Sequence, residues 1–205
     1  AIAGLAGGEP GELLEVAEAL AAAGGLAALE LDSSCADDDG RRFDETPERA
    51  AEMTAALRAA VDLPLIVKLW QGARDPRRTA EAVLAAGADA LSLVNAPAAI
   101  VIDTRTRRPI GGGAPRLSGP AIRPMAVRMV YQLAQALPGV PLIGAGGVTC
   151  ADDALQFIMA GARAVQVGTA TLVDPGTTVD IIEELEAFLE REGLSEIAEL
   201  IGAAL

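Results

Sequence analysis

Residues 160–169 read AGARAVQVGT, and residues 86–95 read AGADALSLVN. In both stretches an Ala-Gly pair closes an amphipathic segment, and a short apolar run follows within three residues. Such a junction is typical of a helix that leads back into a buried parallel strand. The two stretches therefore predict repeated strand–helix units and an α/β fold.

The same alternation extends along the whole chain. Six short runs are apolar on both faces, as buried parallel strands are; they are residues 2–6, 26–31, 65–69, 90–94, 141–144 and 164–167. Helices are predicted between them from capping and proline signals; these helices begin at Pro10, after Thr46, after Asp75, after Pro120, and at Ala151, where Thr149 and Asp152 supply the cap. Residues 178–205 are predicted as two helices that divide at Gly193, with Ile181 and Ile182 facing inward. Six such units fit either a (β/α) barrel or a doubly wound sheet, and the pattern alone leaves both open.

One longer connection, residues 96–117, interrupts this rhythm. It contains four arginines and the run Gly111-Gly112-Gly113. We expect it to form a small hairpin and a Gly-rich loop over the ligand-binding end of the sheet.

Composition excludes several classes of function. The 205 residues carry 16 Lys and Arg against 29 Asp and Glu, a net charge of −13, which argues against binding nucleic acid. The chain contains no His, so a Ser-His-Asp triad and His-ligated metal sites are excluded, and we expect no metal site. No apolar run is long enough to span a membrane, and two distant cysteines suit a reducing cytoplasm better than a disulfide framework.

Chemically useful side chains follow the predicted strands at their carboxyl ends, where α/β folds bind ligands. These residues are Asp32 and Cys35, Lys68, Val94 with Asn95 and Ala96, Gly146 with Gly147, and Gly168 with Thr169. The two glycine turns on adjacent strands favour a phosphate site, although glycines also make tight turns for structural reasons alone. Lys68 interrupts an apolar strand, where an amine needs a polar partner unless it lies at a solvated edge. Cys35 is a candidate base or nucleophile, or else a surface thiol without a role.

Several of these stretches, taken in order, resemble class 1 dihydroorotate dehydrogenases. They are Leu29-Glu30-Leu31-Asp32-Ser33-Ser34-Cys35, Ile66-Val67-Lys68-Leu69, Val94-Asn95, residues 117–124 (LSGPAIRP), residues 131–135 (YQLAQ), Gly144-Ala145-Gly146-Gly147-Val148 and Gln166-Val167-Gly168-Thr169-Ala170. The chain is most similar to the NAD-linked subfamily, which works with an iron–sulfur flavoprotein subunit that carries FAD. The resemblance covers the C-terminal two thirds of that family.

The resemblance implies a fold and a chemistry. The family fold is a (β/α)8 TIM barrel, of which residues 1–205 would supply about six units as one FMN-binding domain of a longer protein, lacking the first strands. The implied activity is oxidation of dihydroorotate to orotate in de novo pyrimidine biosynthesis, by a cytoplasmic homo-oligomer that uses FMN.

The resemblance also assigns roles to residues. Cys35 is implied as the base that removes the C5 proton of the substrate, and Lys68 as the contact of the flavin ring. FMN would also be held by Asp32, Val94, Gly119, Gly146, Gly147, Gly168 and Thr169, and the substrate by Asp32, Asn95 and Ala96.

Departures from the family pattern fall at the substrate and flavin face. Asp32 and Asp37 replace asparagines, Ala36 replaces a proline, Gly4 replaces an asparagine and Ala96 replaces a hydroxyl residue. Carboxylates near Cys35, at positions 32 and 37–39, should raise the pKa of its thiol and repel an anionic substrate. Two alternatives therefore stay open: a related pyrimidine reductase or dehydrogenase with another substrate, or a non-catalytic homologue that keeps phosphate binding.

Overall fold

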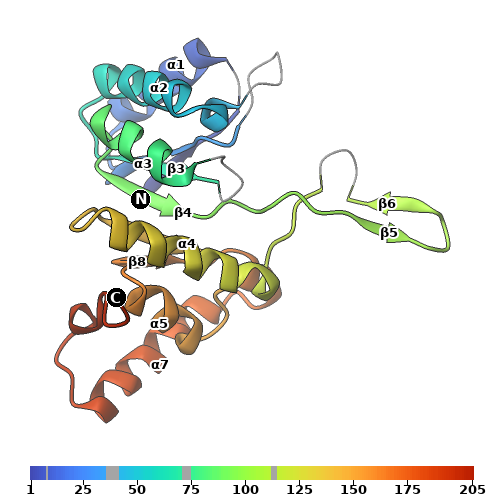
Figure 1. The fold of residues 1–205 in the computed structure, drawn as a ribbon, viewed down its shortest axis with the longest axis vertical. Helices are drawn as coiled ribbons and strands as arrows, with labels where there is room; N and C mark the ends of the chain where they lie inside the picture. Colours follow the sequence, from blue (N-terminus) through green and yellow to red (C-terminus); the bar gives the residue numbers. More distant parts are fainter. Residues whose placement is uncertain (8, 36–41, 71–74, 112–114) are drawn as a thin grey trace.

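The protein is described from a computed structural model, which covers residues 1–7, 9–35, 42–70, 75–111 and 115–205. Ala36, the carboxylates at 37–39 and the glycines at 112 and 113 lie outside the described residues. A six-stranded parallel sheet runs in the order β1-β2-β3-β4-β7-β8 (Figure 1). Its strands are β1 (Ile2–Leu5), β2 (Ala28–Asp32), β3 (Leu65–Leu69), β4 (Ala90–Leu93), β7 (Leu142–Ala145) and β8 (Ala164–Gln166). All six predicted strands are confirmed, with boundaries that differ by at most two residues.

One hydrogen bond shows that the sheet curls into part of a barrel. Gln166 on β8 donates its Nε2 to Glu30 Oε2 on β2 at 2.6 Å. These strands are four places apart in the sheet, which would separate them by about 19 Å in a flat arrangement with ~4.8 Å between strands. The inner face must therefore close on itself, so the doubly wound alternative is excluded and the barrel geometry is confirmed.

Helices follow the strands, and most of them pack on the outer face of the curled sheet. They are α1 (Pro10–Ala23), α2 (Pro47–Ala60), α3 (Pro76–Ala85), α4 (Arg123–Ala136), α5 (Ala151–Met159), α6 (Thr169–Val173) and α7 (Thr177–Glu192), with 3-10 turns η1 (Phe43–Glu45), η2 (Pro120–Ile122) and η3 (Ile197–Leu200). The predicted caps of α2 and α3 are confirmed, because Thr46 accepts the Arg49 N–H at 3.2 Å and Asp75 accepts the Arg78 N–H at 3.1 Å.

Several local predictions were wrong. The N-cap of α5 is Cys150, and Asp153 rather than Asp152 accepts the Thr149 N–H and hydroxyl. Beyond Gly193 the chain forms the 3-10 turn η3 instead of an α-helix, and Ile182 is 52% exposed. Strand β1, at the edge of the sheet, is apolar along its length but is not buried on both faces, because Ile2 is 51% exposed whereas Leu5 is buried. The short helix α6 was not predicted.

The core lies between the sheet and its helices in two clusters. One contains Leu29, Leu31 and Leu57 under α1 and α2, and the other contains Leu91 and Phe157 under α3 to α5. The predicted hairpin is confirmed as β5 (Val101–Asp103) and β6 (Arg108–Ile110), which project from the body on the side toward which β4 points (Figure 1). None of the helices in the described part of the chain has the length and apolar character that crossing a lipid bilayer requires.

Candidate active site

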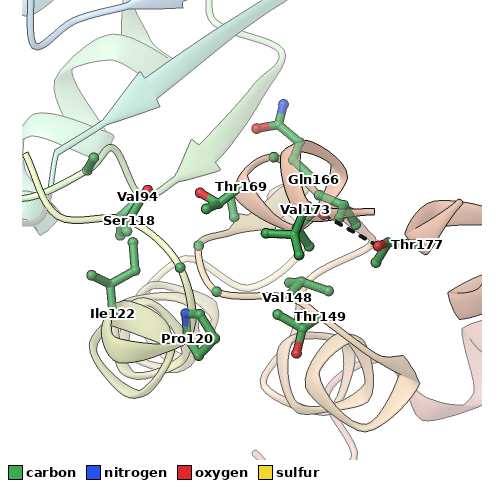
Figure 2. Close-up of a pocket in the computed structure, with 18 of the residues that line it drawn as sticks. Val94, Ser118, Pro120, Ile122, Val148, Thr149, Gln166, Thr169, Val173 and Thr177 are labelled. Carbon is green, nitrogen blue, oxygen red and sulfur yellow. Dashed lines mark hydrogen bonds between the residues drawn. The ribbon is translucent and has the colours of Figure 1, made fainter. Parts of the chain in front are cut away.

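A cavity of about 740 Å³ opens at the carboxyl ends of β3, β4, β7 and β8. Its walls come from the turns after these strands, from η2 and the residues just before it, from α6, and from Thr177 at the start of α7 (Figure 2). Nine residues predicted as site residues line it: Lys68, Val94, Asn95, Ala96, Gly119, Gly146, Gly147, Gly168 and Thr169. The size is typical of a cavity for a small-molecule ligand or cofactor.

Packing requires glycine in one of the two glycine turns but not in the other. Gly147 has φ +79°, and a Cβ there would lie 2.7 Å from Gly119 O, so close backbone packing already requires glycine. Gly168 has an ordinary negative φ, and a Cβ there would meet no atom within 4 Å. Among the described residues, no protein acceptor takes the backbone N–H of Gly147, Gly168 or Thr169. These donors can therefore serve an anion at the cavity end formed by β7 and β8.

A buried carboxylate fixes the turn that contains Gly147. Asp153 on α5 accepts the Thr149 N–H at 3.0 Å and the Thr149 hydroxyl at 2.6 Å, and pairs with Arg123 of α4 at 2.6 Å. Arg123 also donates to Gly147 O at 3.3 Å. Because all these groups come from three different elements, the turn is held in one shape before any ligand arrives.

Lys68 extends into the barrel interior and has two partners there. Its Nζ donates to Glu30 Oε1 at 2.7 Å and to Gln166 Oε1 at 2.9 Å. The side chains of Lys68 and Glu30 are only 17% and 13% exposed. The solvated-edge alternative for Lys68 is thereby excluded. Sequence reasoning missed Glu30 and Gln166, although polar residues in otherwise apolar strands are a signal that could have found them.

Asn95 is engaged by the protein itself. Its Nδ2 donates to Asp32 Oδ1 at 2.8 Å, to Asp32 Oδ2 at 2.7 Å and to Ser34 Oγ at 2.7 Å, while its Oδ1 accepts the Ala96 N–H at 2.8 Å. The backbone donor of Ala96 fixes the orientation of the amide, so its N–H groups face Asp32. Asp32 also accepts from the N–H and hydroxyl of Ser34, at 3.0 and 2.7 Å.

Cys35 lies next to this network, at the end of the turn after β2. Burial is the main cause that raises the pKa of the Cys35 thiol, and the Asp32 carboxylate raises it further. Arg116 opposes this effect, and so does a backbone hydrogen bond from Gly7. The sign expected from the sequence is therefore confirmed for Asp32. Cys35 and Asp32 do not line the 740 Å³ cavity themselves, but Asn95 connects them to its wall.

Two backbone hydrogen bonds anchor the Cys35 segment to the body. Phe43 N donates to Cys35 O at 3.1 Å, and Asp44 N donates to Ser33 O at 2.9 Å. Asp44 is buried, which raises the pKa of its carboxyl group, and it pairs with Arg42 at 2.8 Å. The guanidinium of Arg42 in turn lies 4.0 Å from the ring centre of Trp70. The backbone that carries the thiol is thus bound to the segment that contains Phe43 and Asp44.

Known proteins resemble this chain in sequence and in fold. A family profile described as dihydroorotate dehydrogenase matches residues 2–189. The catalytic subunit of dihydroorotate dehydrogenase B (NAD(+)) from Desulforudis audaxviator is 46% identical over 206 residues, 99% of this chain and 67% of that protein. The corresponding subunit from Halalkalibacterium halodurans is 40% identical over 206 residues, with the same shares of the two chains.

The fold comparison agrees with the sequence comparison. The crystal structure of DHODH in complex with ferulenol from Eimeria tenella matches with a TM-score of 0.78 at 19% identity, over 95% of this chain and 58% of that chain. The chain therefore spans about two thirds of its curated relatives and somewhat less of the solved structure.

Proposed function

Since this chain belongs to the dihydroorotate dehydrogenase family, we propose that residues 1–205 form an FMN-binding domain of an enzyme that oxidises dihydroorotate to orotate in de novo pyrimidine biosynthesis. The observation that carries this proposal is the cavity at the strand ends, because one wall combines two glycine turns and another presents an ammonium group. In (β/α) barrels the usual phosphate site lies at the loops after the last two strands and the start of a short extra helix. Here those loops contain Gly147 and Gly168, and α6 is such a helix.

The residues present fit FMN. The N–H groups of Gly147, Gly168 and Thr169, which bond to no acceptor in the described part of the chain, suit the phosphate, and Gly168 leaves open space for it. Lys68 lines the same cavity, and its ammonium group suits an electron-rich edge of the flavin ring. Bound there, FMN supplies a two-electron acceptor for the substrate.

The chain's own contribution to the reaction is proton transfer and orientation. We assign Cys35 as the base that removes the C5 proton, with its Sγ as the accepting atom. Asn95 and the Ala96 backbone form the neighbouring wall, where the substrate would be oriented. The raised pKa of Cys35 means that little thiolate is present near neutral pH, so proton removal should accelerate as the pH rises.

An electron-transfer partner belongs to the same proposal. The relatives from Desulforudis audaxviator and Halalkalibacterium halodurans are named catalytic subunits of an NAD(+)-dependent enzyme, which supports a second subunit that passes electrons on. We propose an iron–sulfur FAD protein for that role.

One observation favours a second candidate, a family member with a different substrate. The N–H donors of Asn95 are directed at Asp32, which leaves a carboxylate where an anionic substrate would need a donor. A neutral dihydropyrimidine, which offers ring N–H groups without the carboxylate of dihydroorotate, suits Asp32 better.

The experiment that separates these candidates uses the purified protein. A yellow preparation with an FMN spectrum that bleaches when dihydroorotate is added supports the first candidate. A yellow preparation that bleaches only with other dihydropyrimidines supports the second. A protein that stays colourless after incubation with FMN contradicts both and favours the non-catalytic alternative.

A further inference from the structure

Three polar side chains form a closed ring inside the curled sheet. Lys68 Nζ donates to one oxygen of Glu30 at 2.7 Å and to the amide oxygen of Gln166 at 2.9 Å. The amide nitrogen of Gln166 donates to the other oxygen of Glu30 at 2.6 Å. Each member therefore contacts both others, and the ring joins β2, β3 and β8 across the barrel interior.

The ring has only one consistent orientation of its groups. The Gln166 amide oxygen faces the ammonium and its N–H faces the carboxylate, so both contacts of the amide match the charge of their partner. The carboxylate of Glu30 uses one oxygen for each neighbour. Because these side chains are largely shielded from water, a turned amide would place like polarities together at a high cost.

An ammonium group has three N–H donors, and the ring uses two. Within the described residues, no protein acceptor takes the third N–H of Lys68. Lys68 and Gln166 both line the 740 Å³ cavity, whereas Glu30 lies behind them. The remaining donor is therefore available to whatever occupies the cavity.

The composition of the chain adds an independent observation. Lys68 is the only lysine among the 16 basic residues, so arginine serves every other basic position. Arginine presents a planar fork of donors, whereas lysine presents a compact charge with tetrahedral donors. The tetrahedral ammonium suits a site in which two donors are held by the ring and the third points out of it.

We propose that Glu30 and Gln166 are positioning residues that hold the Lys68 ammonium in one place and aim its third N–H into the cavity. Their effect on a bound flavin rests on the proposed function, but their effect on Lys68 does not. The same pair also fixes the distance between β2 and β8, so the position of the ammonium depends on the curl of the sheet.

The first test measures Lys68 directly, without any flavin. Acetylation by an N-hydroxysuccinimide ester at pH 8 is followed by peptide mass spectrometry, and the single lysine gives an unambiguous signal. The amine must leave its acceptors before it reacts with the ester. Glu30→Gln replaces a charged hydrogen bond with a weaker neutral one, so acetylation should accelerate about tenfold. The exchange variant Glu30→Gln with Gln166→Glu returns the carboxylate from the opposite strand and should restore slow acetylation.

The exchange variant also guards against unfolding, because an unfolded chain would not regain slow acetylation. Ser92→Ala is the matched control, since Ser92 is the buried register neighbour of Lys68 on β4 and takes no part in the ring. The proposal is overturned if Glu30→Gln reacts at the wild-type rate, if the exchange variant stays fast, or if Ser92→Ala is as fast as Glu30→Gln.

The second test uses FMN binding, followed by quenching of flavin fluorescence. Gln166→Leu keeps the charges of Glu30 and Lys68 but removes the amide that orients them. We expect its dissociation constant for FMN to rise about tenfold, because Lys68 loses one of the two hydrogen bonds that hold it. An unchanged constant overturns the orienting role of Gln166. A wild-type protein that binds no FMN overturns the proposed function instead, and leaves the acetylation result to decide the roles of Glu30 and Gln166.

Discussion

A substitution at Gly168 separates the phosphate role of the glycine turns from their packing role. A Cβ added at Gly168 would meet no atom within 4 Å, so Gly168→Val should change the free energy of unfolding by about 0.5 kcal/mol or less. The same side chain would occupy the space in front of the N–H groups of Gly168 and Thr169. Loss of one charge-assisted hydrogen bond costs roughly 1.5–3 kcal/mol, so FMN binding should weaken about ten- to hundredfold.

Gly147→Ala provides the contrasting variant. Its Cβ would lie 2.7 Å from Gly119 O and 2.9 Å from Arg123 Cβ. Positive φ adds about 1–2 kcal/mol, and overpacking adds about 1–3 kcal/mol. The summed penalty of about 2–5 kcal/mol should lower the melting temperature by about 4–20 °C.

The assay pairs thermal unfolding with flavin fluorescence titration on both variants. The expected pattern is weak FMN binding by a stable Gly168→Val protein, beside a destabilised Gly147→Ala protein. If Gly168→Val binds FMN as tightly as the wild type, the phosphate does not lie at this turn and the proposed placement of the cofactor is wrong.

Three further predictions address other parts of the site. Lys68→Ala should lower the reduction potential of bound FMN by about 30–60 mV, equivalent to one charged hydrogen bond of roughly 1.5–3 kcal/mol in a two-electron couple. Spectroelectrochemical titration measures this potential, and the double variant Lys68→Ala with Glu30→Gln controls for the carboxylate that loses its partner. An unchanged potential removes Lys68 from the flavin site. In a Cys150→Ser background, iodoacetamide should alkylate Cys35 more slowly at pH 8 than an ordinary thiol, because the raised pKa of Cys35 lowers its thiolate fraction. Asp32→Asn should move the pH midpoint of this alkylation downward. A midpoint that does not move contradicts the effect of Asp32 on the thiol. Asp153→Asn should destabilise the protein by about 2–3 kcal/mol, because Arg123 and Thr149 lose a charged partner. Denaturant unfolding measures this change, and an unfolding midpoint equal to that of the wild type contradicts the role given to the carboxylate.

Local signals explain which parts of the fold were predictable. Strand β3 was predicted with its observed bounds because a five-residue run, apolar except for Lys68, is flanked by Pro64 and a new helix signal. The caps at Thr46 and Asp75 depend only on the residues three positions ahead, so the sequence contains all that determines them. The edge position of β1 depends instead on which strands pair, and an apolar run alone does not contain that information.

The polar ring inside the barrel was not predictable for the same reason. Glu30 and Gln166 are separated by 136 positions, and they meet only because the sheet curls. Position 166 on its own looks like one polar residue in a short strand. The sequence did identify Lys68 as a residue that needs a partner, because an unpaired amine is costly in an apolar strand. The partner itself follows from strand order and curvature, which are global properties.

The two ends of the candidate site differ in what a ligand must do to bind. At the proposed phosphate end, no acceptor among the described residues takes the N–H groups of Gly147, Gly168 and Thr169, and Asp153 holds the turn in place, so a ligand gains hydrogen bonds without breaking any. At the substrate end Asn95 already donates to Asp32 and Ser34, so an anionic ligand must break bonds to a carboxylate before Asn95 can serve it. Each broken bond of this charged type costs roughly 1.5–3 kcal/mol, which is about ten- to hundredfold in affinity. A neutral ligand that donates N–H groups to Asp32 avoids this cost, since the carboxylate keeps its partners and gains one. Under the proposed function, the phosphate-bearing cofactor should therefore bind tightly, and the choice among substrates should depend mainly on the side chain of Asp32.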